Sequence, residues 1–165
     1  RLKVIDLSTG KQPVFNETRE VAVMFNGEIY NYIELRAELE ARLSLPVMTS
    51  YPARKFLAEM DMGRALPKAV SYPVQTWRFD GDLAMVFLGG EVVADYALRL
   101  RRELGADRLW INAYANSVPC YIPSTRVLAE GGYEAERAMD FYGLPTRLIG
   151  DVEERIISTV HELLR

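Results

Sequence analysis

The residue types that most often build metal sites and covalent catalytic sites are scarce in this sequence. Its 165 residues contain one cysteine, Cys120, and one histidine, His161. A single cysteine excludes a disulfide within the chain and says nothing about the cellular compartment. A single histidine excludes any site that needs two imidazoles from this chain alone.

Long apolar runs and a strong charge of one sign are absent as well. No apolar stretch approaches the roughly 18 residues of a membrane-spanning helix, so we expect no transmembrane segment and, by default, a soluble cytoplasmic protein. The formal charge is −3 and basic residues are mixed with acidic ones, which argues against a nucleic-acid partner. Because the chain starts with Arg1 and not methionine, we expect its natural start upstream, and the lack of a signal peptide carries no weight.

The composition that remains is that of an ordinary folded domain, with 49% apolar and 26% charged residues. In the C-terminal two-thirds, apolar runs and turn signals predict strands at 74–79, 83–88 and 108–114. Helical periodicity and end signals predict helices at 53–62, 91–104, 124–130 and 151–164. A hairpin followed by a helix and a strand predicts an α/β fold, a mixed sheet with flanking helices.

The stretch around Glu91 is central to this part. The apolar run at 83–88 is typical of a buried strand, and Gly89-Gly90 allows the backbone to turn sharply after it. We expect Glu91 at the carboxyl end of this strand and in the first turn of the following helix. Open α/β sheets hold ligands at such strand ends, so Glu91 is the best single candidate for chemistry.

The first 43 residues differ in character from the rest. Strand signals at 2–5 and 21–25 precede Asn26-Gly27, a pair that favours a hairpin turn. Asn31 and Glu34 have the spacing of a capping box, which predicts a helix to residue 43. The expected unit is a small β-β-α segment, joined to the second part by a linker at 44–52.

This first segment resembles the glutamine amidotransferase domain of asparagine synthetases. The resemblance is carried by residues 1–10, 12–13, 25–31 (Phe-Asn-Gly-Glu-Ile-Tyr-Asn) and 34–36. It implies that Arg1 holds the α-carboxylate of glutamine in a bidentate fork and that Glu28 contacts its amino end. It also implies that Asn26 and Gly27 form the oxyanion hole.

Two departures lead us to expect no working chemistry in this segment. The family uses an N-terminal cysteine as its nucleophile, and residues 1–43 contain no cysteine. The family's later Ser-Asp-x-Glu string, whose acid helps to bind glutamine, is absent after Leu43.

The second part, residues 53–165, resembles the C-terminal portion of the catalytic domain of neutral/alkaline ceramidases. The motifs that carry this resemblance are residues 72–79, 88–93, 113–116, 121–124, 132–134 and 142–143. Members of that family are zinc amidohydrolases that cleave the N-acyl bond of a sphingolipid. The resemblance implies that Glu91 and Tyr121 are two zinc ligands, completed by two histidines that lie upstream in the family.

The main hypothesis is therefore an incomplete ceramidase-type hydrolase segment for a lipid amide, inactive alone and without bound zinc, because the histidines and the nucleophile region are missing. One alternative is a fragment of a glutamine-hydrolysing amidotransferase. Another is a non-catalytic globular domain that binds a partner. The composite chain could be a gene fusion, a degraded gene or an artefact of sequence assembly.

Overall fold

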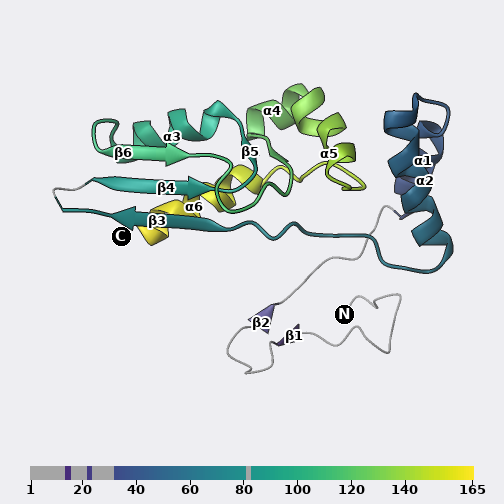
Figure 1. The fold of residues 1–165 in the computed structure, drawn as a ribbon, viewed down its shortest axis with the longest axis horizontal. Helices are drawn as coiled ribbons and strands as arrows, with labels where there is room; N and C mark the ends of the chain where they lie inside the picture. The colour runs from purple at the N-terminus through teal and green to yellow at the C-terminus, as the bar shows by residue number, and fades with distance from the viewer. Residues whose placement is uncertain (1–13, 16–21, 24–31, 81–82) are drawn as a thin grey trace.

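A three-stranded sheet is the framework of the larger body of the structure, a computed structural model that describes residues 14–15, 22–23, 32–80 and 83–165. The strands are β3 (Val74–Arg78), β4 (Ala84–Leu88) and β6 (Leu109–Asn112), in the order β3-β4-β6. β3 pairs antiparallel with β4, and β6 pairs parallel with it. The sheet is mixed, so the predicted α/β class is confirmed (Figure 1).

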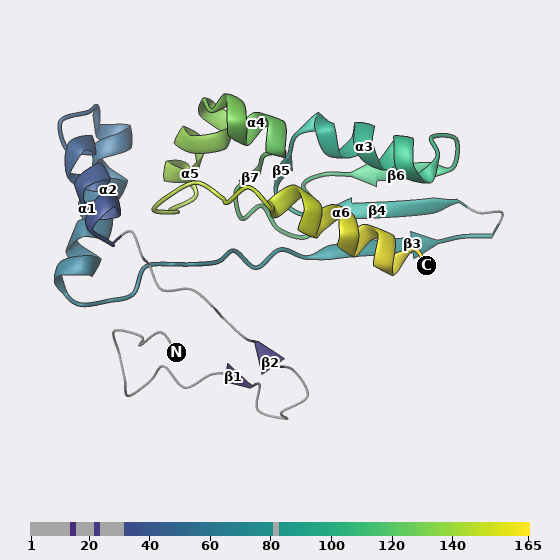
Figure 2. The same ribbon diagram turned by 180° about the vertical axis from the view of Figure 1, so that it is seen from behind.

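Two helices, α3 (Ala94–Leu104) and α6 (Val152–Leu163), cover one face of the sheet (Figure 2). They belong to one hydrophobic cluster with Val86 and Leu88 of β4, both fully buried. The register places Met85 of β4 between Trp77 and Trp110, on the opposite face of the sheet. These two tryptophans are 49% and 60% exposed, so that face is left uncovered by the described residues.

Shorter elements connect and complete this body. They are β5 (Glu91–Val92), β7 (Tyr121–Ile122), α4 (Thr125–Glu130), the π-helix η1 (Tyr133–Arg137) and α5 (Ala138–Phe141). The expected helix ends are confirmed where the cap chemistry is clear. Ser124 accepts a hydrogen bond from the Val127 backbone N–H at the start of α4, and Gly105 ends α3 with φ 92°.

Two helices form a separate hairpin with a hydrophobic core of its own. These are α1 (Tyr32–Arg42), which confirms the predicted helix, and α2 (Val47–Asp61). The buried residues of this core are Leu35, Leu39, Ala53, Phe56, Leu57, Met60 and Leu66. They come from both sides of the expected 44–52 linker, so the hairpin joins the two predicted segments.

Several boundaries differ from the sequence prediction. The helix expected at 53–62 begins at Val47, so most of the expected linker is helical, and Pro52 lies inside that helix. The strand expected at 108–114 ends at Asn112 because the backbone of Tyr114 turns left-handed, with φ 56°. The elements η1 and α5 were not predicted, since no periodic apolar pattern marks them.

The N-terminal segment is described only in part. A two-stranded antiparallel pair joins β1 (Val14–Phe15) to β2 (Ala22–Val23), and β2 lies within the strand expected at 21–25. The strand expected at 2–5 and the Asn26-Gly27 turn lie outside the described residues. The longest described helix, α2, has 15 residues, and no described helix is long and apolar enough to cross a bilayer.

Candidate functional site

A close backbone contact fixes Glu91 after the central strand. Gly90 has φ 75°, and a Cβ at this position would lie 2.7 Å from the carbonyl oxygen of Cys120 and 2.8 Å from Ile122 Cγ1. The backbone N–H of Gly90 donates to the carbonyl of Ser117 at 2.8 Å. The loop between β6 and β7 therefore packs directly on this glycine, which only a residue without a side chain allows.

The short strands β5 and β7 then bring the two predicted ligands together. They pair in parallel, with Glu91 opposite Tyr121 and Val92 opposite Ile122. The Glu91 backbone N–H donates to the Cys120 carbonyl at 3.0 Å. Residues paired in register point to the same face of a sheet, so the Glu91 carboxylate and the Tyr121 phenol are neighbours.

Further tyrosines surround the same carboxylate. A hydrogen-bonding interaction with Glu91 raises the pKa of Tyr121 to about 12 and also raises the pKa of Tyr114. Burial, followed by the charge of Glu91, raises the pKa of Tyr142 to about 12. The ring of Tyr133 lies edge-on to that of Tyr121, with centroids 5.7 Å apart. We call these five residues the Glu91 cluster.

The Glu91 cluster is a partly buried carboxylate among four phenols. Such a group can accept hydrogen bonds, and it can hold a cation through oxygen ligands. No group of three or more His, Cys, Asp or Glu able to hold a metal ion occurs among the described residues. Within that part of the chain, a zinc ion at Glu91 and Tyr121 would therefore have only oxygen ligands.

The position of Glu91 relative to α3 differs from our expectation. Glu91 belongs to β5, and α3 begins three residues later at Ala94. Asp95 is the acidic residue in the first turn of the helix, so the favourable interaction with the helix N-terminus belongs to Asp95. Glu91 is placed by strand pairing instead.

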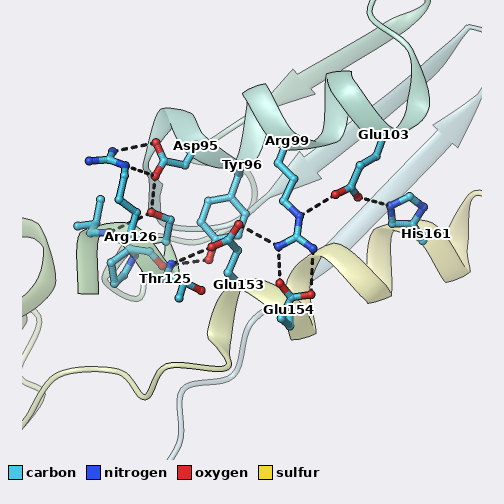
Figure 3. Close-up of polar contacts among 12 residues, drawn as sticks. Asp95, Tyr96, Arg99, Glu103, Thr125, Arg126, Glu153, Glu154 and His161 are labelled. Atoms are coloured by element: carbon cyan, nitrogen blue, oxygen red, sulfur yellow. Dashed lines mark hydrogen bonds and ion pairs between the residues drawn. The ribbon is translucent and has the colours of Figure 1, made fainter. Parts of the chain in front are cut away.

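His161, the single imidazole, belongs to a different cluster, between α3 and α6 (Figure 3). Its Nε2 lies 2.7 Å from Oε2 of Glu103, near the C-terminal end of α3. Glu91 precedes the other end of α3, whose 11 residues rise about 1.5 Å each. His161 is therefore not positioned to complete a metal site with Glu91.

The α3–α6 cluster has the geometry of a structural ion-pair network. Arg99 donates from Nε to Glu103 at 2.8 Å, from Nη1 to Glu153 at 3.0 Å and from Nη2 to Glu154 at 2.9 Å. Glu153 in turn accepts from the Thr125 backbone N–H at 2.8 Å, which satisfies the start of α4. Every carboxylate of this network has a partner, so the cluster joins three helices and leaves no group aimed at a ligand (Figure 3).

The remaining sequence-predicted site residues lie outside the described part of the chain. These are Arg1, Asn26, Gly27 and Glu28, the residues assigned to glutamine. Cys120 is described, and it is fully buried. Burial raises the pKa of its thiol to about 11, so this cysteine is an inert core residue and not a nucleophile.

Sequence reasoning missed three members of the Glu91 cluster. Tyr114, Tyr133 and Tyr142 each lie in a motif that carried the ceramidase resemblance, yet none was given a function. The available signal was their shared residue type near the ends of predicted elements. Their approach to Glu91 depends on the loop after β6 and on η1 and α5, whose conformations no sequence pattern indicated.

Comparisons with known proteins address the N-terminal segment. Residues 1–48 match the family described as glutamine amidotransferase domain. Asparagine synthetase 1 of Bacillus subtilis (strain 168) is 57% identical over 42 residues, which are 26% of this chain and 7% of that protein. Asparagine synthetase of Triphysaria versicolor is 56% identical over 39 residues, and asparagine synthetase 1 of Arabidopsis thaliana is 55% identical over 40 residues. Each alignment covers 24% of this chain and 7% of the relative.

The chain thus spans about 7% of the length of these curated relatives. No solved structure matches it. The family match ends at residue 48 and supports the amidotransferase part of the predicted composite. The ceramidase resemblance expected of residues 53–165 receives no support from these comparisons. Residues 1–48 are accordingly similar to the glutamine amidotransferase domain of asparagine synthetases.

Proposed function

We propose that residues 1–48 are part of a glutamine amidotransferase domain of the asparagine synthetase type, and that they contribute to glutamine binding. The observation that carries this proposal is the family match over these residues, together with 57% identity to a glutamine-hydrolysing asparagine synthetase over 42 residues. It replaces our main sequence hypothesis as the better supported function.

Four residues carry the proposed binding. Arg1 offers two parallel N–H groups to the α-carboxylate of glutamine, and Glu28 offers a carboxylate to its ammonium group. Asn26 and Gly27 donate to the oxygen on which negative charge develops during amide hydrolysis. These groups bind and orient the amide, but they do not supply a nucleophile.

This chain is expected to bind glutamine without hydrolysing it. Residues 1–48 contain no cysteine, and the thiol of Cys120 is buried with its pKa raised to about 11. Amide cleavage by this family of sites needs a nucleophile next to the oxyanion hole.

The test is a titration of the purified chain with L-glutamine, followed by NMR chemical shifts. We expect saturable shifts, and Arg1→Gln should lower the affinity for L-glutamine by about tenfold, which corresponds to the loss of one charge-assisted hydrogen bond. Arg19→Gln is the matched control, since the resemblance gives that arginine no contact with glutamine. D-glutamine should bind more weakly. If L-glutamine causes no saturable shift, or if both arginine variants bind it equally, the proposal fails.

The Glu91 cluster favours a second function, a zinc-dependent amide hydrolase of ceramidase type. The supporting observation is the register that sets Glu91 opposite Tyr121. Zinc, when bound, would supply Lewis-acid polarisation of the amide carbonyl of a lipid amide. Glu91 would hold the ion through its carboxylate and Tyr121 through its phenol oxygen, which would give up its proton only in the presence of a cation, because its pKa is about 12.

Glu91 and Tyr121 supply two oxygen ligands, but zinc sites of this kind also need histidine imidazoles, and the described residues place no imidazole next to Glu91. We therefore expect weak binding, which Co²⁺ reports through its visible absorption without any need for activity. Glu91→Gln should abolish the signal and Tyr121→Phe should reduce it. Glu130→Gln, a change on exposed α4, should not alter it. A signal unchanged in Glu91→Gln would contradict the assignment.

A further inference from the structure

Helix α5 is one turn of four residues, and its consecutive side chains reach different parts of the molecule. Met139 is 1% exposed within the large core. Asp140 points to the α1–α2 hairpin, where it meets Arg42. The ring of Phe141 lies 6.3 Å from that of Tyr133, and Tyr142 follows as the residue that interacts with Glu91.

The ion pair of Arg42 and Asp140 ties the hairpin to this turn, next to contacts between α2 and α5. Arg42 Nη1 donates to Asp140 Oδ1 at 3.0 Å, across 98 residues of sequence. The side chain of Asp140 is 7% exposed, while that of Arg42 is 27% exposed. Burial raises the pKa of the Asp140 carboxyl, and the charge of Arg42 offsets part of this rise, so the arginine favours the ionised form of a buried carboxyl.

A helix of one turn does not hold its conformation by its own hydrogen bonds, because helix nucleation is unfavourable. The place of α5 is set by the partners of its side chains. It also follows directly on η1, a π-helix, a conformation that is rare and concentrated near functional sites. Backbone hydrogen bonds from Tyr142 and Leu144 to the Met139 carbonyl, both 3.1 Å, transmit the position of α5 to the residues that follow.

We propose that Arg42 is a positioning residue for the Glu91 cluster, acting through Asp140 and α5 to hold Tyr142 against Glu91. Arg42 belongs to the segment that matches the amidotransferase family, whereas Glu91 and Tyr142 belong to the ceramidase-like part. The joined N-terminal segment thus organises a site in the second part. A role for this coupling in function rests on the proposed cation site at Glu91. The effect of Arg42 on the position of Tyr142 does not depend on that site.

Loss of Arg42 has a defined physical consequence. The Asp140 carboxylate would remain buried without its counter-charge, a state that proteins relieve by protonation or by moving the group into water. Either response weakens the hold of the hairpin on α5. Removal of both charges should relieve the strain, because the neutral amide introduced by Asp140→Asn does not require a cation.

The experiment compares Arg42→Gln, Asp140→Asn and the double variant with the full chain. One readout is amide hydrogen exchange at residues 138–144. The other is the ring signal of Tyr142 in chain labelled with ¹³C-tyrosine, assigned by Tyr142→Phe. Arg64→Gln is the matched control, since Arg64 pairs with Glu59 inside the hairpin, at 3.1 Å.

We expect Arg42→Gln to raise exchange at 138–144 by about tenfold or more and to shift the Tyr142 signal. In Arg42→Lys, which keeps the positive charge, and in the double variant, both readouts should lie close to those of the unmodified chain. Arg64→Gln should change neither readout. A Tyr142 signal that stays unchanged in Arg42→Gln overturns the proposal, as does a double variant as perturbed as the single one. If Co²⁺ fails to bind while Tyr142 still responds, the cation site falls and the positioning by Arg42 stands.

Discussion

The sheet-based body and the α1–α2 hairpin bury their apolar residues on different scales. The body encloses eleven buried residues that extend from Val86 in β4 to Val160 in α6, and many partly buried ones pack around them. The hairpin encloses seven, with Leu43 alone packed against them. A small core leaves little stability of its own after the entropy of ordering the chain is counted. The hairpin therefore depends on its docking to α5, whereas the large core of the body does not depend on the hairpin for its stability, even though Arg42 of the hairpin positions α5.

A cavity in the core of the body and a cavity in the core of the hairpin should differ most strongly in their effect on the free energy of global unfolding. Leu100 and Leu39 are both fully buried, in the body and in the hairpin respectively. Leu100→Ala should lower the free energy of global unfolding by about 2–5 kcal/mol, measured by urea denaturation. Leu39→Ala should leave that global transition nearly unchanged and instead speed hydrogen exchange in α1 and α2. Equal losses of global stability in the two variants would show that hairpin and body unfold as one unit.

Two glycines with similar backbone angles allow the contact after β4 to be isolated. Gly90 and Gly63 have φ 75° and 70°, but a Cβ at Gly63 would meet nothing within 4 Å. Gly63→Ala should destabilise the fold by about 1 kcal/mol through the left-handed backbone alone. Gly90→Ala adds a collision with the Cys120 carbonyl and should lose about 3 kcal/mol in total. Thermal unfolding of both variants gives the difference, and similar losses would mean that the loop yields without strain.

Acid should weaken the body through the α3–α6 network. Hydrogen bonds from Arg99 lower the pKa of Glu103 and of Glu154. A carboxyl whose folded pKa lies below its unfolded value stabilises the fold above the unfolded pKa of about 4.3, and this contribution is lost as pH falls through the folded pKa.

We therefore expect the free energy of unfolding to decrease as pH falls below about 5, measured by urea denaturation at several pH values. Arg99→Gln should flatten this dependence as well as lower stability near neutral pH. Arg155→Gln serves as the control, because Arg155 pairs with exposed Asp151 on its own side of α6, at 2.7 Å. A pH profile with the same slope in Arg99→Gln would exclude this network as its source.

Proteolysis should show the smallest effect. A linker at 44–52, as the sequence predicts, would be cleaved early, but α2 begins at Val47 and protects most of that stretch. Residues 64–73 form no regular element and connect α2 to β3 (Figure 1). Trypsin should cut after Arg64 or Lys68 before it cuts after Arg54 or Lys55 within α2, as mass spectrometry of the first fragments would reveal. Early cleavage after Arg54 would indicate that the hairpin opens readily.

The sequence predicted the body more completely than the joint between the segments. Helix α3 was marked by Tyr96 and Leu100 on one face and by Gly105 at its end, and β4 by an unbroken apolar run. The start of α2 was missed because Pro46 and Pro52 read as linker signals, although Phe56 and Leu57 complete a core with Leu35 and Leu39. Local propensity gives way there to tertiary packing.

In the candidate site, too, some neighbours were predicted from the sequence and others were set by tertiary packing. Glu91 and Tyr121 were expected together from the resemblance, and the register of β5 and β7 places them side by side. The approach of Tyr114 and Tyr142 was not foreseeable, because it depends on a left-handed turn at Tyr114 and on the docking of α5. The polar pairs that link α3 to α6 were equally hidden, since they join residues more than 50 positions apart, such as Arg99 and Glu153.

The two-residue pairing of β5 with β7 makes the length of one loop a chemical constraint. Side chains of a strand alternate between faces, so a shift by one residue would set buried Ile122 opposite Glu91 and turn Tyr121 into the core. Only residues 113–120 separate β6 from β7, and their backbone packs on Gly90. A single insertion or deletion in this loop would exchange a phenol for an aliphatic side chain at the site without altering any residue of the site itself. Loop length here should therefore vary less through evolution than the identity of the loop's exposed residues.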